Sequence, residues 1–216
     1  MNTDIRPDTA NILDMYAKLK SCQTIASDFG VNLKPHCDAA ASCLGATPAE
    51  TLANTTPSSL AELHRKIEAL AKGAIAMLCK SQADYYNSEF HRRLEAIAES
   101  SELTPLKESV DTKYREAITL FSSSKSQTFD EFWKVSNQSV QFLLCSANLV
   151  SRHGALSAIA SALGVKEDSS EVSSEVSSNL LDRAKGALKI ESPKELLPTD
   201  DIDRIKSSFL NEIRGL

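Results

Sequence analysis

The sequence predicts an all-α protein, a helical bundle of long antiparallel helices with short accessory helices. Three observations predict this fold class. Apolar residues recur at helical spacing along most of the chain, and no alternating apolar and polar run bounded by turn residues predicts a strand. Gly and Pro number only 7 each in 216 residues, fewer than a sandwich or barrel of this length needs. Hydrophobic residues make up 42% of the chain, which is enough to build a core.

The first helix is predicted to start at Asp8 or Thr9, because a short side-chain oxygen can accept a free amide of the first turn. It is expected to end at Gly30, since Gly adopts the left-handed conformation that often follows a helix. Residues 31–58 are expected to form an irregular region of short helices. One lies within KPHCDAAASCLG, and the next begins at the capping box TPAE and ends near Asn54.

The longest helix is predicted to begin at SLAE, residues 59–62, and to run to about Glu99. At about 1.5 Å per residue such a helix spans the whole molecule or kinks, and Gly73 is a candidate for the kink. The next helix is expected to start at Thr104 and Pro105. Its apolar face consists of Leu106, Val110, Tyr114, Ala117 and Phe121.

The stretch SQTFDEFWKVSNQSVQFLLCSANLVSRHG, residues 126–154, is predicted to form one helix with two apolar stripes. The capping box TFDE begins it. A broad stripe is expected to face the core: Phe129, Phe132, Trp133, Ser136, Val140, Leu143, Leu144, Ala147 and Val150. A narrow stripe lies on the opposite side: Val135, Phe142, Cys145 and Leu149. Three of its members are seven residues apart, as in a coiled coil.

Two interpretations of the narrow stripe remain open. Neighbouring helices cover the helix on both sides, or the stripe binds a second copy of the chain, another protein or an apolar surface. No charged residue lies between Val135 and Ser151, but Asn and Gln residues interrupt the run, so it is not a membrane span. Gly154 is expected to end or bend the helix, and ALSAIASALG either continues it or forms a short partner helix.

The bundle is expected to occupy residues 1–164. Residues 165–178 contain a doubled SSEV unit and are predicted to be a Ser/Glu-rich linker, and residues 179–216 are predicted to form C-terminal amphipathic helices. The net charge of −5 argues against a nucleic-acid partner. Five scattered Cys fit a reducing compartment, and neither a signal peptide nor a transmembrane run is visible. We expect a cytoplasmic protein; secretion through a signal without a hydrophobic trace remains an alternative.

The sequence shows no motif for catalysis, a cofactor or a metal. His36, Cys37 and Cys43 supply only half of the paired ligands that a zinc site needs. Cys145 and His153 are two helical turns apart, too far for a nucleophile to bond directly to its base. We therefore expect no catalytic, cofactor or metal site.

Two segments resemble those of phasins, the helical proteins that coat polyhydroxyalkanoate granules in bacteria. LAELHRKIEALAKGAIAMLCKSQADYYNSEFHRRLEAIAES resembles the family's long Ala- and Gln-bearing helix. SSKSQTFDEFWKVSNQSVQFLLCSANLVSR is similar to its segment in which a Lys-containing turn precedes an acidic–Phe start and a Gln-rich helix. The resemblance covers residues 60–150. The five Cys and the Ser/Glu-rich segment depart from the family pattern. It implies surface coating by amphipathic helices, with the narrow stripe against the polymer.

The leading functional hypothesis is a non-enzymatic helical protein that acts through protein–protein contacts or self-association, as an adaptor, regulator or effector. The narrow stripe of Val135, Phe142, Cys145 and Leu149 is its candidate binding surface. A phasin-like coat of a hydrophobic granule is the first alternative. A small-ligand-binding or catalytic bundle with a pocket between helices is the second.

Overall fold

The computed structural model describes residues 6–45, 48–97, 103–123, 127–162, 197 and 200–215. These residues form seven α-helices and one short 3-10 helix, and they contain no strand, so the predicted all-α bundle is confirmed. The elements are α1 (Pro7–Ala26), η1 (Ser27–Phe29), α2 (Lys34–Leu44), α3 (Pro48–Asn54), α4 (Pro57–Glu95), α5 (Thr104–Ser122), α6 (Phe129–Ala162) and α8 (Asp200–Gly215). The two short helices expected between residues 31 and 58 are α2 and α3.

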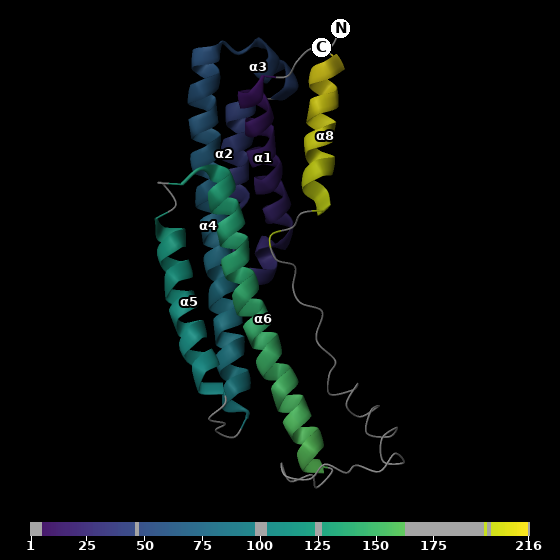
Figure 1. Ribbon diagram of the computed structural model, residues 1–216. Coiled ribbons are helices and arrows are strands. Elements are labelled where there is room, and N and C mark those ends of the chain that lie inside the picture. The colour runs from purple at the N-terminus through teal and green to yellow at the C-terminus, as the bar shows by residue number, and fades with distance from the viewer. Residues whose placement is uncertain are drawn as a thin grey trace.

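The 39-residue α4 is the central helix of the bundle. It packs against α1, α2, α5 and α6, and its most extensive contact is with α6. Successive long helices reverse direction, so that α4 and α6 run the same way and α5 returns beside them (Figure 1). Helices α1 and α2 lie along the first half of α4, and α8 lies against α1 on the outside (Figure 1).

The start of α1 differs from the sequence prediction. The helix begins at Pro7, so both predicted cap residues, Asp8 and Thr9, lie inside its first turn. Proline fits this position because its missing N–H has no partner in a first turn anyway. The N-cap residue is Arg6, whose guanidinium donates to the carbonyl oxygens of Leu52 (3.0 Å) and Thr55 (3.1 Å). A long-range contact with the end of α3 therefore fixes this helix start.

The bounds of α4 are also shifted. It begins at Pro57, two residues before the predicted box, and Thr56 is its cap, with its hydroxyl accepting from the amide of Ser59 (3.4 Å). It ends at Glu95. The helix continues through Gly73 without a break. A Cβ at this position would lie 3.6 Å from Nε2 of the His36 ring, an ordinary contact with α2.

The start of α6 is the predicted capping box. The Thr128 amide donates to the carboxylate of Glu131 (3.1 Å), and the amide of Glu131 donates to the Thr128 hydroxyl (3.3 Å). The helix then continues through Gly154 to Ala162, so Gly154 does not end it, and the predicted alternative in which ALSAIASALG continues the helix is confirmed as far as Ala162. A Cβ there would lie 3.2 Å from Cδ1 of Ile97, so the Gly allows α6 to lie close to the end of α4.

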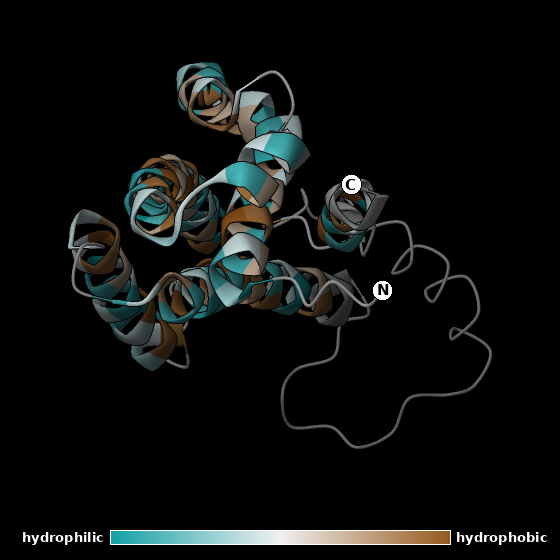
Figure 2. Ribbon diagram, turned by 90° about the horizontal axis from the view of Figure 1, so that it is seen from above, coloured by the Kyte–Doolittle hydropathy of each residue, from teal (hydrophilic) through white to brown (hydrophobic). Residues whose placement is uncertain are grey.

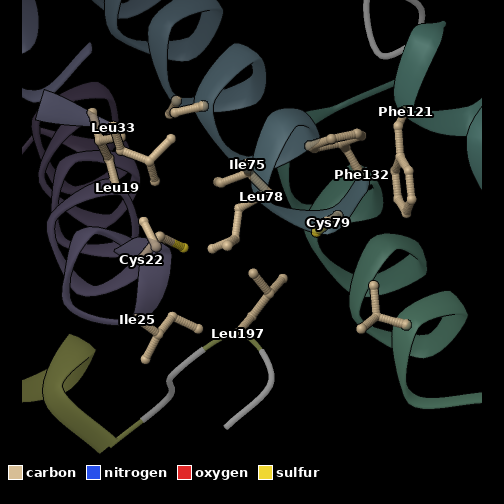
Figure 3. Packing of buried hydrophobic residues seen from close by; sticks show 14 of the residues in the cluster. Leu19, Cys22, Ile25, Leu33, Ile75, Leu78, Cys79, Phe121, Phe132 and Leu197 are labelled. Atoms are coloured by element: carbon tan, nitrogen blue, oxygen red, sulfur yellow. The ribbon is translucent and has the colours of Figure 1, made fainter. Parts of the chain in front are cut away.

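Apolar side chains of α1, α4, α5 and α6 meet in one core (Figure 3). Leu19 of α1, Leu78 of α4 and Phe132 of α6 are among its fully buried members. Viewed from above, apolar and polar residues lie on different sides of the same helices (Figure 2). The predicted broad stripe of α6 is buried except for Trp133 and Leu144, which are half-buried and pack against the core.

The predicted linker, residues 165–178, lies outside the described residues, as does Thr47 of the TPAE box. Of the predicted C-terminal helices, Leu197 and α8 are described, and α8 packs against α1 and α3. Leu197 and Ile202 are buried, and Lys206 forms an ion pair with Asp14 (3.1 Å). None of the described helices is both long and apolar enough to cross a membrane.

Candidate functional site

The predicted narrow stripe lies on the outer side of α6. Val135 and Leu149 are exposed large apolar side chains, and Cys145 is an exposed thiol. Phe142 is half-buried and packs against the edge of the core. Neighbouring helices therefore cover the broad stripe of α6 and leave most of the narrow stripe open.

The stripe is longer than the sequence prediction. Leu156 follows Leu149 by seven residues and is also exposed. The seven-residue spacing alone could have identified Leu156. It was not extended past Gly154, because this residue was expected to end or bend the helix. We call Val135, Phe142, Cys145, Leu149 and Leu156 the outer stripe.

The outer stripe turns gradually away from the core. Residues seven apart on a straight α-helix lag by about 20° at each step, because 3.6 residues make one turn. Phe142 is half-buried, and beyond it the exposed fraction rises to 53% at Leu149 and 61% at Leu156, compared with 38% at Val135. Cys145 lies three residues after Phe142 and four before Leu149, so it shares their side of the helix.

Charged residues are nearly absent from this part of α6. Apart from His153, Arg152 is the only residue with an ionisable, normally charged side chain between Lys134 and Lys166. Elsewhere, exposed helix faces carry ion pairs, as between Lys80 and Asp84 on α4 (3.1 Å). An aligned set of exposed apolar side chains with almost no charge is typical of an interaction surface.

A cleft with a volume of about 430 Å³ opens where α1, α4 and the start of α6 meet. This volume is within the range of small-ligand sites. The lining residues are Asn11, Asp14, Met15, His64, Glu68, Thr128, Phe129 and Asp130. Three of the eight are carboxylates, so its chemistry depends on whether these groups are engaged.

Asp14 in the cleft is held by two lysines. Lys18 approaches it at 2.7 Å and Lys206 at 3.1 Å. Burial raises the pKa of the Asp14 carboxyl, but the hydrogen bonds and charges of Lys18 and Lys206 outweigh it, so this pKa lies below its usual value. The Lys18 ammonium also lies over the rings of Phe129 and Trp133, 5.2 Å from each centroid. These contacts tie the start of α6 to α1.

The other two carboxylates are also engaged. Asp130 lies 3.5 Å from the ammonium of Lys18, and Glu68 lies 2.9 Å from the ammonium of Lys72. Lys72 is buried and also donates to the backbone carbonyl of Gln127, just before α6. Within the described ranges, no group of three or more His, Cys, Asp and Glu side chains is placed to hold a metal ion. The cleft charges therefore join helices to one another.

The five cysteines differ sharply in accessibility. Cys22, Cys37 and Cys79 are buried, and burial raises the pKa of the Cys22 and Cys79 thiols. Cys43 is half-buried on α2, and Cys145 is the one exposed thiol of the five. The outer stripe thus carries the most accessible of the five thiols.

No family model matches the chain, and no curated protein or solved structure matches it either. The resemblance to phasins therefore remains a prediction, and a functional argument has to start from the geometry of α6 and of the cleft.

Proposed function

We propose that the protein is a non-enzymatic helical interaction protein that binds a protein partner through the outer stripe of α6. The observation that carries this proposal is the set of exposed apolar side chains Val135, Leu149 and Leu156, with the half-buried Phe142 between them, on a nearly uncharged helix face. Seven-residue spacing suits packing against a second helix, because it keeps the contact on one side of both helices. We expect this protein to work in the cytoplasm, where an exposed Cys145 stays reduced.

The outer stripe offers enough apolar surface for a measurable complex. Burying one leucine side chain contributes about 1.5–3 kcal/mol. Leu149 and Leu156 are both more than half exposed, so a partner helix would gain from each. Part of this free energy offsets the translational and rotational entropy that the two molecules lose on binding, so we expect moderate rather than tight affinity.

The test replaces the most exposed members of the stripe. Leu149→Glu and Leu156→Glu place a charge in the contact, and we expect each to weaken recovery of a stoichiometric partner at least about tenfold. Met77→Glu is the matched control, because Met77 is exposed to 46% but lies on α4. Quantitative pull-down by the full chain measures the effect. Equal recovery by all variants would contradict the proposal.

A stability measurement separates lost binding from lost folding. Because Leu149 is exposed, Leu149→Glu should change the free energy of unfolding by no more than about 0.5 kcal/mol. Leu143→Ala, on the buried side of the same helix, should cost about 2–5 kcal/mol. Urea denaturation of both variants gives the comparison.

A phasin-like coat of hydrophobic granules is a second candidate function, favoured by the same uncharged face of α6. A coat protein should sediment with polyhydroxybutyrate particles in the absence of any other protein, and Leu149→Glu with Leu156→Glu should abolish this. If the wild-type chain stays in solution, the coat function is excluded and binding of a protein partner remains as the proposed function. The cleft supports no separate candidate, because Lys18, Lys72 and Lys206 engage its carboxylates.

A further inference from the structure

Four of the five residues of the outer stripe are evenly spaced along α6 and are therefore symmetric about one midpoint. Val135 pairs with Leu156 and Phe142 with Leu149 about the same midpoint, which lies between Cys145 and Ser146. If two copies of α6 lie antiparallel about a two-fold axis at this midpoint, each apolar side chain of one copy faces an apolar side chain of the other. Such a self-complementary patch is what a two-fold interface requires.

We infer that the partner of the outer stripe is a second copy of this chain, with the two α6 helices antiparallel and Cys145 beside the axis. This inference rests on the proposed function, since it names the protein that occupies the proposed surface. The arrangement gives a homodimer in which both copies bury the same five residues.

The charges of α6 favour the antiparallel over the parallel direction. A parallel pair would place Arg152 beside its own copy and Lys134 beside its own copy, which repels at both ends. In the antiparallel pair Arg152, the one normally charged residue from Val135 to Leu156, falls opposite the neutral Ser139 rather than beside its own copy. Antiparallel helices also oppose their dipoles, so each positive end lies toward a negative end.

The extent of the contact predicts its strength. From Val135 to Leu156 the stripe is roughly 32 Å long at the usual helical rise. A single pair of helices of this length lies at the low end of specific interfaces, which bury about 1,200 Å² or less when contacts are transient. We therefore expect a reversible dimer in the micromolar range. α6 offers the room for it, since its C-terminal end extends past the adjacent ends of α4 and α5 (Figure 1).

Sedimentation velocity of the full chain over a range of micromolar concentrations tests self-association. We expect a monomer–dimer equilibrium that Leu149→Glu and Leu156→Glu each weaken at least about tenfold. Met77→Glu, a change at another exposed apolar residue on α4, should leave the equilibrium intact. A chain that stays monomeric overturns the inference, as does a dimer that is indifferent to both changes. If the wild-type protein is monomeric but binds a different protein, and Leu149→Glu weakens that binding, the proposed function stands and only the identity of the partner is wrong.

Crosslinking with a short bismaleimide tests the position of the axis. In the proposed pair Cys145 of one copy falls opposite Ser146 of the other, so the two thiols lie near each other without facing directly, and a spanning reagent avoids the strict geometry of a disulfide. In the Cys43→Ser chain, Cys145 is the accessible thiol, and a covalent dimer should form. The Cys145→Ser chain, which keeps the half-buried Cys43, should give almost none. Equal yields of covalent dimer from the two variants would show that the copies do not meet at Cys145.

The direction of the pair is tested with new cysteines in a chain that carries both Cys43→Ser and Cys145→Ser. Gln138 and Arg152 are exposed and lie at nearly equal distances on either side of the midpoint. A mixture of Gln138→Cys and Arg152→Cys proteins should crosslink, and neither protein alone should. Crosslinking of each protein to itself, without mixing, would show a parallel pair and overturn the antiparallel assignment.

Discussion

At the scale of single residues, Asp14 joins parts of the chain that are far apart. Its carboxylate meets Lys18 one turn further along α1 and Lys206 of α8, and the latter is 192 positions away. Lys18 in turn reaches Asp130 at the start of α6. The hydrogen bonds and charges of both lysines outweigh the burial that raises the pKa of Asp14, and the net effect is a lowered pKa. One carboxylate therefore links three helices electrostatically.

Asp14→Asn should lower the free energy of unfolding at pH 7 by about 1–2 kcal/mol, because it removes the charge from a partly buried network. The pKa of Asp14 is lower in the folded than in the unfolded protein. The stabilisation is therefore complete above the unfolded pKa of about 4 and is lost as the pH falls through the folded pKa. Urea denaturation across this range should show the two proteins converging in acid.

The exposed pair of Lys34 and Asp38, 2.7 Å apart, provides the control for this pH dependence. Asp38→Asn should change the stability at pH 7 by no more than about 0.5 kcal/mol. A difference between wild type and Asp14→Asn that stays constant from neutral to acid pH would contradict the electrostatic account.

At the scale of elements, the long helices depend on contacts that override weak local signals. α4 passes Gly73 and α6 passes Gly154 without interruption. A glycine inside a helix costs about 0.5–1 kcal/mol relative to alanine, which packing on both flanks easily exceeds. The two glycines differ, because Gly154 faces Ile97 closely whereas Gly73 leaves ordinary room beside His36.

Gly73→Ala should stabilise the protein by about 0.5–1 kcal/mol, since alanine restricts the unfolded chain and its Cβ fits beside the His36 ring. Gly30→Ala is the contrasting change. Gly30 has φ of 69°, a left-handed conformation that costs a residue with a Cβ about 1–2 kcal/mol. Urea denaturation should move the midpoint up for the first variant and down for the second. A shift in the same direction for both would contradict this explanation.

The sequence predicted what depends on neighbouring residues. The capping box of Thr128 and Glu131 and the buried face of α6 follow from local spacing, and both are confirmed. The cap of α1 was missed because Arg6 bonds to the end of α3 rather than to its own helix. The outward direction of the outer stripe was also undecided, because it depends on which side of α6 is covered by α4 and α5. Such choices are set by packing between distant segments.

At the scale of the whole molecule, the described part of α8 packs mainly against two helices, α1 and α3. It lies on the outside of the bundle, whereas α4 and α6 share the core (Figure 1). Ile202, the partly buried Leu210 and the ion pair of Lys206 with Asp14 hold it in place. Local opening requires least free energy where few apolar contacts are broken, so α8 is expected to open before the rest of the bundle.

Hydrogen exchange of the native protein should therefore show faster exchange for the amides of α8 than for those of α4 and the first half of α6. Ile202→Glu should speed exchange throughout α8, because it places a charge in a buried contact, while protection in α4 changes little. Asn211 is exposed on the same helix, so Asn211→Glu is the matched control and should leave the exchange of α8 nearly unchanged. Equal protection of α8 and α4 would contradict the proposed order of opening.

The central place of α4 also has a consequence for synthesis. The apolar faces of α1 and α2 are completed by contact with α4, so they stay unfinished while the ribosome makes its 39 residues. At about 5–20 residues per second this interval is roughly 2–8 s. During it, the nascent chain presents Leu19 and Ile12 of α1 to solvent, and chaperones that recognise apolar segments have their main opportunity to bind.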